Sequence, residues 1–329
     1  MPALKGYVSR TRELSLKPSV ILNCRHHANE VSSTTSSLLL LRTLLTDAEF
    51  SDLGQKLRLI IIPMENPDGA AIHALLSREH PRHKLHVARF NALGYEFAYD
   101  NFKADTIHRE AHATLRLFKE YLPDVIIDDH GVPTHEWEQP FSGYTSPAFK
   151  GFWLPRSILY GYFWYPEGVG YEAQLALCQA VQKAVCRAVS QDAELSELNA
   201  VWQERFEKYA HRFMPKLFPA DYQDGMIHYW IGKKPSADNL YTSQRWPWVN
   251  SCYYTSEVAD ETAQGSYLVL CARTHLLEDL AILRFLLSTE RHITVINAWQ
   301  KGGLCGVFER KRPVLPSQRF PEPNEPGIK

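Results

Sequence analysis

This sequence predicts an α/β fold: a mixed, largely parallel central sheet flanked by helices. Short apolar runs, typical of buried strands, alternate along the chain with longer segments in which apolar residues recur at helical spacing. Such alternation is typical of a sheet that is covered by helices. Because ligands of these folds bind beyond the carboxyl ends of the strands, we expect the functional site at that edge of the sheet.

The predicted strands are apolar runs that stop at polar or turn-forming residues. The run Ile60-Ile61-Ile62, for example, stops at Pro63 and passes into a turn of Asn, Pro, Asp and Gly. The run after Asp124 is continuously apolar, and the segment that begins at Cys252 alternates. The sequence therefore predicts strands over residues 19–23, 58–63, 124–128, 252–258 and 292–297.

Helices are predicted between these strands, over residues 31–46, 103–121 and 274–288. The first is rich in leucine and reads as a buried helix, since its apolar stretch is shorter than the roughly 20 residues that a membrane span requires. The long stretch between the third and fourth strands predicts a helical insertion near residues 140–225. Within it, residues 171–212 read as one or two amphipathic helices over the cleft, and residues 141–165 as an aromatic-rich loop.

The 329 residues suit one large α/β domain or two modest ones, and we expect a single domain over residues 1–309. Residues 310–329 contain five prolines and predict an extended tail.

The composition indicates a folded protein without a polyanionic partner. A hydrophobic content of 45 % and a formal net charge of -1 exclude disorder and favour neither nucleic acid nor an anionic membrane as a partner. The six cysteines show no C-x-x-C spacing and are sparse for a disulfide scaffold, so we expect them to be free and mostly buried.

The segment His27-Ala28-Asn29-Glu30 directly follows the first predicted strand. It places an imidazole and a carboxylate three residues apart, where a single turn can aim both at one zinc ion. By itself this pair is weak, because histidine and glutamate are common residues.

Three later motifs follow predicted strands in the same way. They are Asn66-Pro67-Asp68-Gly69, Asp128-Asp129-His130 and Thr255-Ser256-Glu257. The order H-x-x-E, N-P-D-G, D-x-H and T-x-E resembles that of the zinc carboxypeptidase family, the carboxypeptidase A-like metallopeptidases, over roughly residues 18–290. Four ordered motifs are far more specific than any one of them.

The resemblance implies that His27, Glu30 and His130 bind one zinc ion per chain and that Glu257 is the general base. The chemistry agrees, because three protein ligands leave a fourth position for water, as in catalytic zinc sites. Zinc makes that water acidic, and a carboxylate that is not a ligand can take its proton and pass it to the leaving nitrogen. The implied reaction is hydrolysis of a peptide bond.

Residues that hold the substrate are expected between Asn66 and His130. Arg89 could supply the guanidinium that stabilises the oxyanion in the family, although a surface arginine is an equally good interpretation. Residues 94–102 resemble the family segment G-x-D-x-N-R-N-F, with Glu96 in the acid position, where it would hydrogen-bond the zinc-binding His27.

The same segment departs from the family at the pair that grips a free C-terminal carboxylate. Ala98-Tyr99 replaces the family's Asn-Arg, so the requirement for a free C-terminus is in doubt while the zinc chemistry is not. Tyr241 is a candidate for the mobile tyrosine that covers the substrate, with Tyr253 and Tyr254 as alternatives.

Several neighbouring residues have competing interpretations. His26 also has an acid nearby in Glu30, but adjacent side chains diverge, so only one of His26 and His27 should face the metal; the family pattern assigns His27. Asp129 fills a position that is commonly apolar in the family. The pair His135-Glu136 either lines the cleft or is a solvated loop pair.

Three functions are consistent with these motifs. The first is a zinc metallopeptidase of the carboxypeptidase-like class. The second, favoured by the missing Asn-Arg pair, is an amidase or deacylase that acts on a small N-acyl amino acid or a cell-wall peptide. The third is a non-catalytic binding protein that retains the fold, an interpretation weakened by the presence of all three ligands and the base. The expected partner is a peptide or amide substrate, with no nucleic acid and no membrane, and the oligomeric state is open.

The N-terminus is short for the family, which usually places two strands and a helix ahead of the H-x-x-E strand, whereas only 26 residues precede His27. We therefore hypothesise an abbreviated or truncated domain that lacks the first edge strands or receives them from a partner. No secretory signal is recognised. A cytoplasmic location is the default expectation, with secretion the alternative if the start is truncated.

Overall fold

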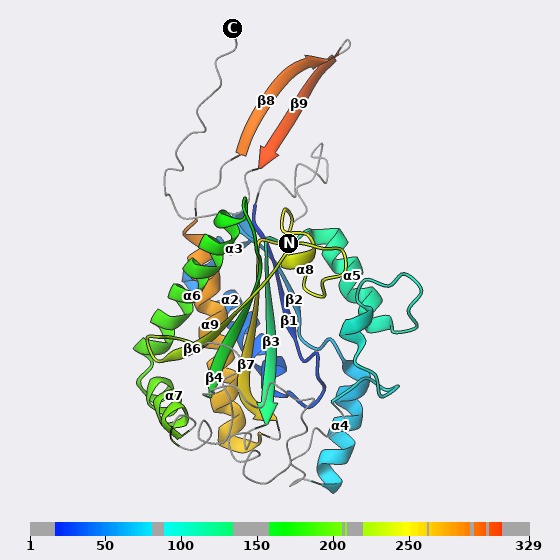
Figure 1. The fold of residues 1–329 in the computed structure, drawn as a ribbon. Coiled ribbons are helices and arrows are strands. Elements are labelled where there is room, and N and C mark those ends of the chain that lie inside the picture. Colours follow the sequence, from blue (N-terminus) through cyan, green and yellow to red (C-terminus); the bar gives the residue numbers. More distant parts are fainter. Residues whose placement is uncertain are drawn as a thin grey trace.

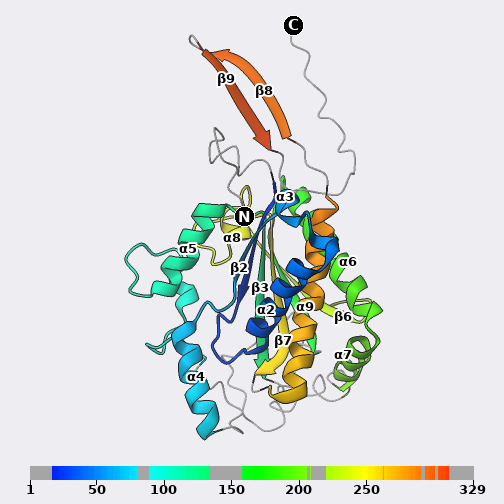
Figure 2. The ribbon, with the colours of Figure 1, turned by 180° about the vertical axis from the view of Figure 1, so that it is seen from behind.

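The chain folds around a seven-stranded sheet with helices on both faces (Figures 1 and 2). The computed structural model describes residues 17–80, 89–133, 158–205, 208, 220–261, 263–289, 293–300 and 303–310. The strand order is β2-β1-β3-β7-β4-β6-β5. The strands are β1 (Ser19–Cys24), β2 (Arg58–Ile62), β3 (Val125–Pro133), β4 (Leu159–Pro166), β5 (Asp221–Gln223), β6 (Met226–Lys233) and β7 (Cys252–Glu261).

Most strand pairs are parallel. β1 pairs in parallel with β2 and β3, β3 with β7, and β4 with β6, whereas β4 with β7 and β5 with β6 are antiparallel. The predicted mixed, largely parallel sheet with flanking helices is therefore confirmed. In this arrangement β1, β3 and β7 run in the same direction, so their carboxyl ends meet at one edge (Figure 1).

The helices divide between the two faces of the sheet. They are α2 (Ser32–Thr46), α3 (Leu53–Lys56), α4 (Pro67–Glu79), α5 (Arg109–Tyr121), α6 (Glu172–Gln191), α7 (Ala193–Arg205), α8 (Thr242–Arg245) and α9 (Gly265–Leu287), with 3-10 turns η1 (Ala48–Phe50) and η2 (Phe97–Asp100). On one face α2, α6 and α9 pack on the main core, which includes Val20, Leu22 and Ile127. On the other face Phe118 of α5 packs with Ile21, Ile126 and Trp246.

The predicted elements near the first motif agree closely with the structure, and later ones differ at their ends. Residues predicted as helix from 103 onward begin a helix only at Arg109, because Asp100 holds the preceding turn through Thr106 Oγ1 at 2.7 Å and Lys103 Nζ at 2.5 Å. The last helix, α9, begins at Gly265, upstream of the predicted start at 274. The predicted strand at 292–297 is β8 (Ile293–Gln300), which pairs with β9 (Gly303–Arg310) in a separate hairpin rather than in the central sheet.

The prediction of an aromatic-rich loop over residues 141–165 is wrong for those residues of it that the structure describes. Residues 159–166 form strand β4 between β7 and β6, and Tyr160 and Phe163 are buried there. Aromatic side chains fit a pleated surface that is covered on both sides, which is why this run is a strand. Phe141, Tyr144, Phe152 and Trp153, which belong to the same expectation, lie outside the described residues.

Helices do occupy much of residues 171–212, but they do not cover the cleft. α6 buries Leu177, Val181 and Val185 in the main core beside α9, on the face of the sheet away from α5 and α8. The expectation of a cover over the cleft is therefore wrong for α6. The domain boundaries at 1–309, the insertion near 140–225 and the tail at 310–329 stay predictions, and residues 311–329 lie outside the described part of the chain.

Five cysteines, at positions 24, 178, 186, 252 and 271, are free and buried. This agrees with the expectation for these five; Cys305 has no described side chain. None of the helices in the described ranges is both long and apolar enough to cross a membrane.

Leu22 tests the packing of the core. It is fully buried on β1, in register with Ile61 of β2 and Ile127 of β3. Leu22→Ala should lower the free energy of unfolding by about 2–5 kcal/mol, because it removes buried methyl groups and leaves a cavity. Leu45→Ala on α2, where the side chain is 78 % exposed, should change it by no more than about 0.5 kcal/mol. Equal effects of the two substitutions in denaturant titrations would contradict this packing.

Candidate metal centre

The two halves of the H-x-x-E motif meet at the end of β1 because the chain turns sharply there. Arg25 has a φ of 58°, a left-handed conformation that is uncommon for a residue other than glycine, and its Nε donates to the Ala28 carbonyl at 2.9 Å. The Glu30 amide then donates to the His27 carbonyl at 3.2 Å. This turn folds Glu30 back beside His27.

His130 reaches the same point from β3, which pairs with β1 in the sheet. The Nδ1 atoms of His27 and His130 are 3.2 Å apart. Glu30 contacts both rings, with Oε1 2.5 Å from His27 Nδ1 and Oε2 3.1 Å from His130 Nδ1. The structure thus brings together the three predicted ligands.

This donor set fits a zinc ion. Tetrahedral zinc has bonds of about 2.0–2.2 Å to nitrogen and oxygen, which separates its ligand atoms by about 3.3 Å. Two imidazole nitrogens and one carboxylate are also the ligands of known catalytic zinc sites, and they leave one position open. Burial raises the pKa of Glu30, but its interactions with His27 and His130 hold that pKa well below the ordinary value.

In both His27 and His130, the second ring nitrogen, Nε2, contacts a carboxylate. Glu96 Oε2 lies 2.9 Å from His27 Nε2, the contact expected for Glu96, and Asp128 Oδ2 lies 3.2 Å from His130 Nε2. Asp128 itself accepts from Tyr253 Oη at 2.7 Å. Such contacts fix the orientation and tautomer of a metal-binding imidazole and raise its basicity.

His26 bridges two carboxylates. Its Nδ1 lies 2.7 Å from Glu65 Oε2 and its Nε2 lies 2.6 Å from Glu96 Oε1, and its ring plane is 76° from that of His27. Burial opposes its charge, but Glu65 and Glu96 outweigh burial and raise the pKa of His26 to about 10. His26 therefore links Glu65 to Glu96 and positions Glu96.

Glu257 lies beside His130 on the neighbouring strand. The two residues are direct partners in the parallel pairing of β3 and β7, so their side chains emerge on the same face of the sheet. Arg89 Nη1 lies 3.1 Å from Glu30 Oε1 and 3.4 Å from Glu261 Oε1. Burial lowers the pKa of Arg89, but Glu30 and Glu261, with smaller contributions from Glu96 and Glu257, raise it.

A cavity of about 240 Å³ lies beside the three donor residues, two of which, His27 and His130, line it. Its wall includes His27, Arg89, Glu96, His130 and Tyr241. The Tyr241 ring stacks on Trp164 with centroids 3.6 Å apart, and burial raises the pKa of its hydroxyl well above the usual value.

Of the two alternative tyrosines, only one faces this cavity. Tyr253 lines it, but the Tyr253 hydroxyl already donates a hydrogen bond to Asp128 Oδ2. Tyr254 lies on the other face of the sheet and donates to Glu278 Oε2 at 3.0 Å.

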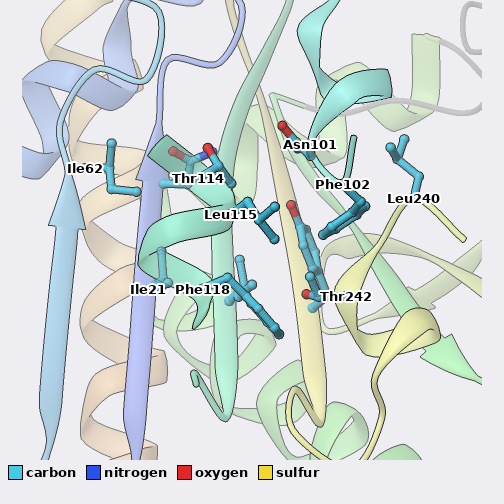
Figure 3. A pocket seen from close by; sticks show the side chains of 12 residues that line it. Ile21, Ile62, Asn101, Phe102, Thr114, Leu115, Phe118, Leu240 and Thr242 are labelled. Carbon is cyan, nitrogen blue, oxygen red and sulfur yellow. The ribbon is translucent and has the colours of Figure 1, made fainter. Parts of the chain in front are cut away.

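A smaller, mostly apolar cavity of about 40 Å³ adjoins the first and shares Asn23, Thr114, Leu240 and Tyr253 with it. Figure 3 shows Ile21, Leu115, Phe118 and Phe102 gathered around it. They come from β1, α5 and the segment after η2. An apolar group of a ligand in the main cavity would therefore lie near these apolar side chains.

The sequence interpretation missed three residues of the polar network. Asn23 Nδ2 donates to Glu65 Oε2 at 2.7 Å and to Asp128 Oδ1 at 3.0 Å, and Thr114 Oγ1 donates to Glu65 Oε1. A buried asparagine near the end of an apolar strand was an available signal for Asn23. Glu65 and Thr114 carried no signal, because only the packing of α5 brings them together. His135 and Glu136 lie outside the described residues.

The model of the zinc carboxypeptidase family matches residues 5–85, which include the H-x-x-E and N-P-D-G motifs. Over that segment the chain is similar to the zinc carboxypeptidase family. The family resemblance drawn from the four motifs is thereby confirmed. None of the curated protein sequences matches this chain.

Solved structures of metallopeptidases are similar to this chain at low identity. A metallo-carboxypeptidase from Burkholderia cenocepacia is 13 % identical, with 86 % of this chain and 59 % of that chain covered and a TM-score of 0.47. A Pseudomonas aeruginosa metallo-carboxypeptidase in complex with (2-guanidinoethylmercapto)succinic acid is 16 % identical, with 83 % and 58 % covered and a TM-score of 0.45. This chain thus spans less than two thirds of either protein, and at these scores the likeness carries no argument about activity.

A substitution of Glu96 tests how the proposed zinc ligand His27 is oriented. Glu96→Gln should weaken zinc binding about 10- to 100-fold, because His27 loses the carboxylate that fixes its ring. Competition with a chelating dye measures the affinity. Glu79→Gln, at an exposed position on α4, is the matched control and should bind zinc as the wild type does. An unchanged affinity of Glu96→Gln would contradict the positioning role.

Proposed function

We propose that this chain is a zinc-dependent hydrolase that cleaves a peptide bond, as a carboxypeptidase-like metallopeptidase. The observation that carries the proposal is the convergence of His27 Nδ1, His130 Nδ1 and Glu30 at the end of β1 and β3, with Glu257 in register beside His130. A cavity of about 240 Å³ opens onto this cluster and gives room for a substrate.

The proposed division of labour follows from where each side chain lies. When bound by His27, Glu30 and His130, zinc supplies a Lewis acid and an acidic water. Glu257 takes the proton and returns it to the leaving nitrogen, a duty open to a carboxylate that is not a ligand. Arg89 directs its charge at the developing oxyanion, and its ion pairs with Glu30 and Glu261 hold the guanidinium in place.

A second candidate function is an amidase or deacylase that acts on a small N-acyl amino acid or a cell-wall peptide. One observation favours it: Ala98 and Tyr99 line the cavity in place of the family's Asn-Arg pair. Among the described lining residues, Arg89 and His26 already pair with carboxylates. A free terminal carboxylate therefore lacks the bidentate clamp that a standard carboxypeptidase provides.

The adjoining cavity supports an apolar group on the substrate. Ile21, Leu115 and Phe118 line it, and its small volume suits a short aliphatic side chain better than a charged one (Figure 3). We therefore expect substrates with a small apolar residue beside the scissile bond to be preferred over those with a charged residue.

Glu257→Gln tests the general base. The substitution should reduce turnover by about 10²- to 10⁴-fold, because the amide cannot accept a proton from the attacking water. The zinc content should stay that of the wild type, since Glu257 is not a proposed ligand. Turnover against the preferred peptide and zinc per chain are the two measurements. A fully active Glu257→Gln protein would overturn this role.

Peptides with free and with blocked C-termini separate the two candidate functions. Cleavage of only the free-end peptides would establish a carboxypeptidase without the clamp, whereas cleavage of only blocked or branched amides would establish the amidase. Both activities should be lost in His27→Ala, which removes one ligand of the zinc. A purified chain that stays free of metal when zinc is supplied would overturn both, and it would support the non-catalytic binding protein.

A further inference from the structure

A second polar cluster lies behind the metal centre, on the opposite face of the same strands. Successive residues of a strand point to opposite faces, so Asp128 and His130 face the cavity while Asp129 between them faces α9. On β7, Ser256 likewise faces α9. The helix α9 completes the cluster with His275, Glu278 and Asp279, which share one of its faces at spacings of three and four residues.

The donor atoms of this cluster surround His275 Nδ1. It lies 3.1 Å from Glu278 Oε1, 3.2 Å from Ser256 Oγ and 3.7 Å from Asp129 Oδ1. One donor atom each from Asp129, His275 and Glu278 lies within 4.8 Å of the others, and all three residues are fully buried. The spacing is wider than that of His27, Glu30 and His130, where the donor atoms are 2.5–3.2 Å apart.

Hydrogen bonds among the described residues leave His275 Nε2 and both Asp279 oxygens without a partner. A neutral imidazole carries one hydrogen, and Nδ1 of His275 faces two carboxylates at once. If the hydrogen is on Nδ1, that single hydrogen faces the carboxyl groups of both Asp129 and Glu278. If the hydrogen is on Nε2, the lone pair of Nδ1 faces the oxygens of these two carboxyl groups. Within the described part of the chain Nε2 of His275 has no hydrogen-bond partner, so nothing there favours its protonation.

Asp279 adds an unpartnered carboxyl group to the cluster. It is fully buried, and neither of its oxygens has a hydrogen-bond partner among the described residues. Burial raises its pKa well above the ordinary value, and the nearby charges of Asp129 and Glu278 raise it further. Burial likewise raises the pKa of Glu278 to about 8. No lysine or arginine in the described ranges forms an ion pair with Asp129, Glu278 or Asp279.

We propose that Asp129, His275 and Glu278 bind a second divalent transition-metal cation, whose charge the Asp129 and Glu278 carboxylates neutralise, with Asp279 supplying a further oxygen beside them. A mixed imidazole and carboxylate set suits zinc, manganese or iron, whereas calcium and magnesium prefer oxygen ligands alone. The cation gives the Nδ1 lone pair and the carboxylates a common partner, while the Ser256 hydroxyl donates to Asp129 Oδ1 at 3.1 Å. Because every ligand is buried, the ion has a structural role.

The proposed ion joins three elements immediately behind the first site. Asp129 lies between Asp128, which orients the ring of His130, and His130 itself. Ser256 precedes Glu257 on β7. A cation that ties these residues to α9 therefore fixes the strand ends that carry His130 and Glu257.

Metal content per chain tests the proposal. The full chain is incubated with Zn²⁺ or, separately, Mn²⁺, dialysed against metal-free buffer and analysed by mass spectrometry of the elements. We expect two ions in the wild type and in Glu79→Gln, one in His27→Ala, one in Glu278→Gln and none in the double variant. One ion in the wild type that is absent from His27→Ala and retained in Glu278→Gln would overturn the second site.

A melting measurement keeps the test independent of how well Glu278→Gln folds. In metal-stripped His27→Ala, added Zn²⁺ should raise the Tm, because the second site is intact. In His27→Ala with Asp279→Asn, which is isosteric, the rise should be smaller. A Tm of His27→Ala that does not respond to either metal would overturn the proposal. The inference does not depend on hydrolysis, so an inactive wild type with two ions would support this site and overturn only the proposed function.

Discussion

Parallel pairing of β1, β3 and β7 is the constraint on which the metal centre depends. Residues distant in the sequence, Cys24, Asp129 and Ser256, become direct neighbours across these strands. The segments that follow them then meet at one edge, because parallel strands end on the same side. Without this register, His27 and Glu30 would have no partner in His130, and Glu257 would not lie beside it.

The charged groups at this edge of the sheet need hydrogen-bonding and ion-pair partners around them. Isolated buried charges are costly, and the chain offsets that cost by joining them into pairs. Asp128 contacts His130, and Glu96 contacts both His26 and His27. Glu65 contacts the other ring nitrogen of His26. Gly131 makes the close packing possible, since a Cβ there would lie 1.8 Å from Asp260 Oδ1. Each of these groups is thus held in place by another.

The two faces of β3 and β7 carry different polar clusters on a shared backbone. His130 lines the cavity and Glu257, its partner in register, shares that face of the sheet, while Asp129 and Ser256 face α9. A period of two residues per strand therefore places the proposed structural cation directly behind the proposed catalytic one. This explains a departure from the family pattern, because Asp129, in a position that is commonly apolar, has polar partners on α9.

The sequence by itself determined the strands that carry the motifs, because uninterrupted apolar runs such as Ile60-Ile61-Ile62 end at clear turn residues. It also determined the family and the candidate ligands, because the motifs are local and ordered. Local pattern did not reveal β4, whose aromatic run reads equally well as a loop, or the side of the sheet on which α6 packs. Only the tertiary structure decided that His26 bridges Glu65 and Glu96, and that Asp129 meets His275 and Glu278. Those contacts join residues from separate elements, and no spacing along the chain encodes which elements pack together.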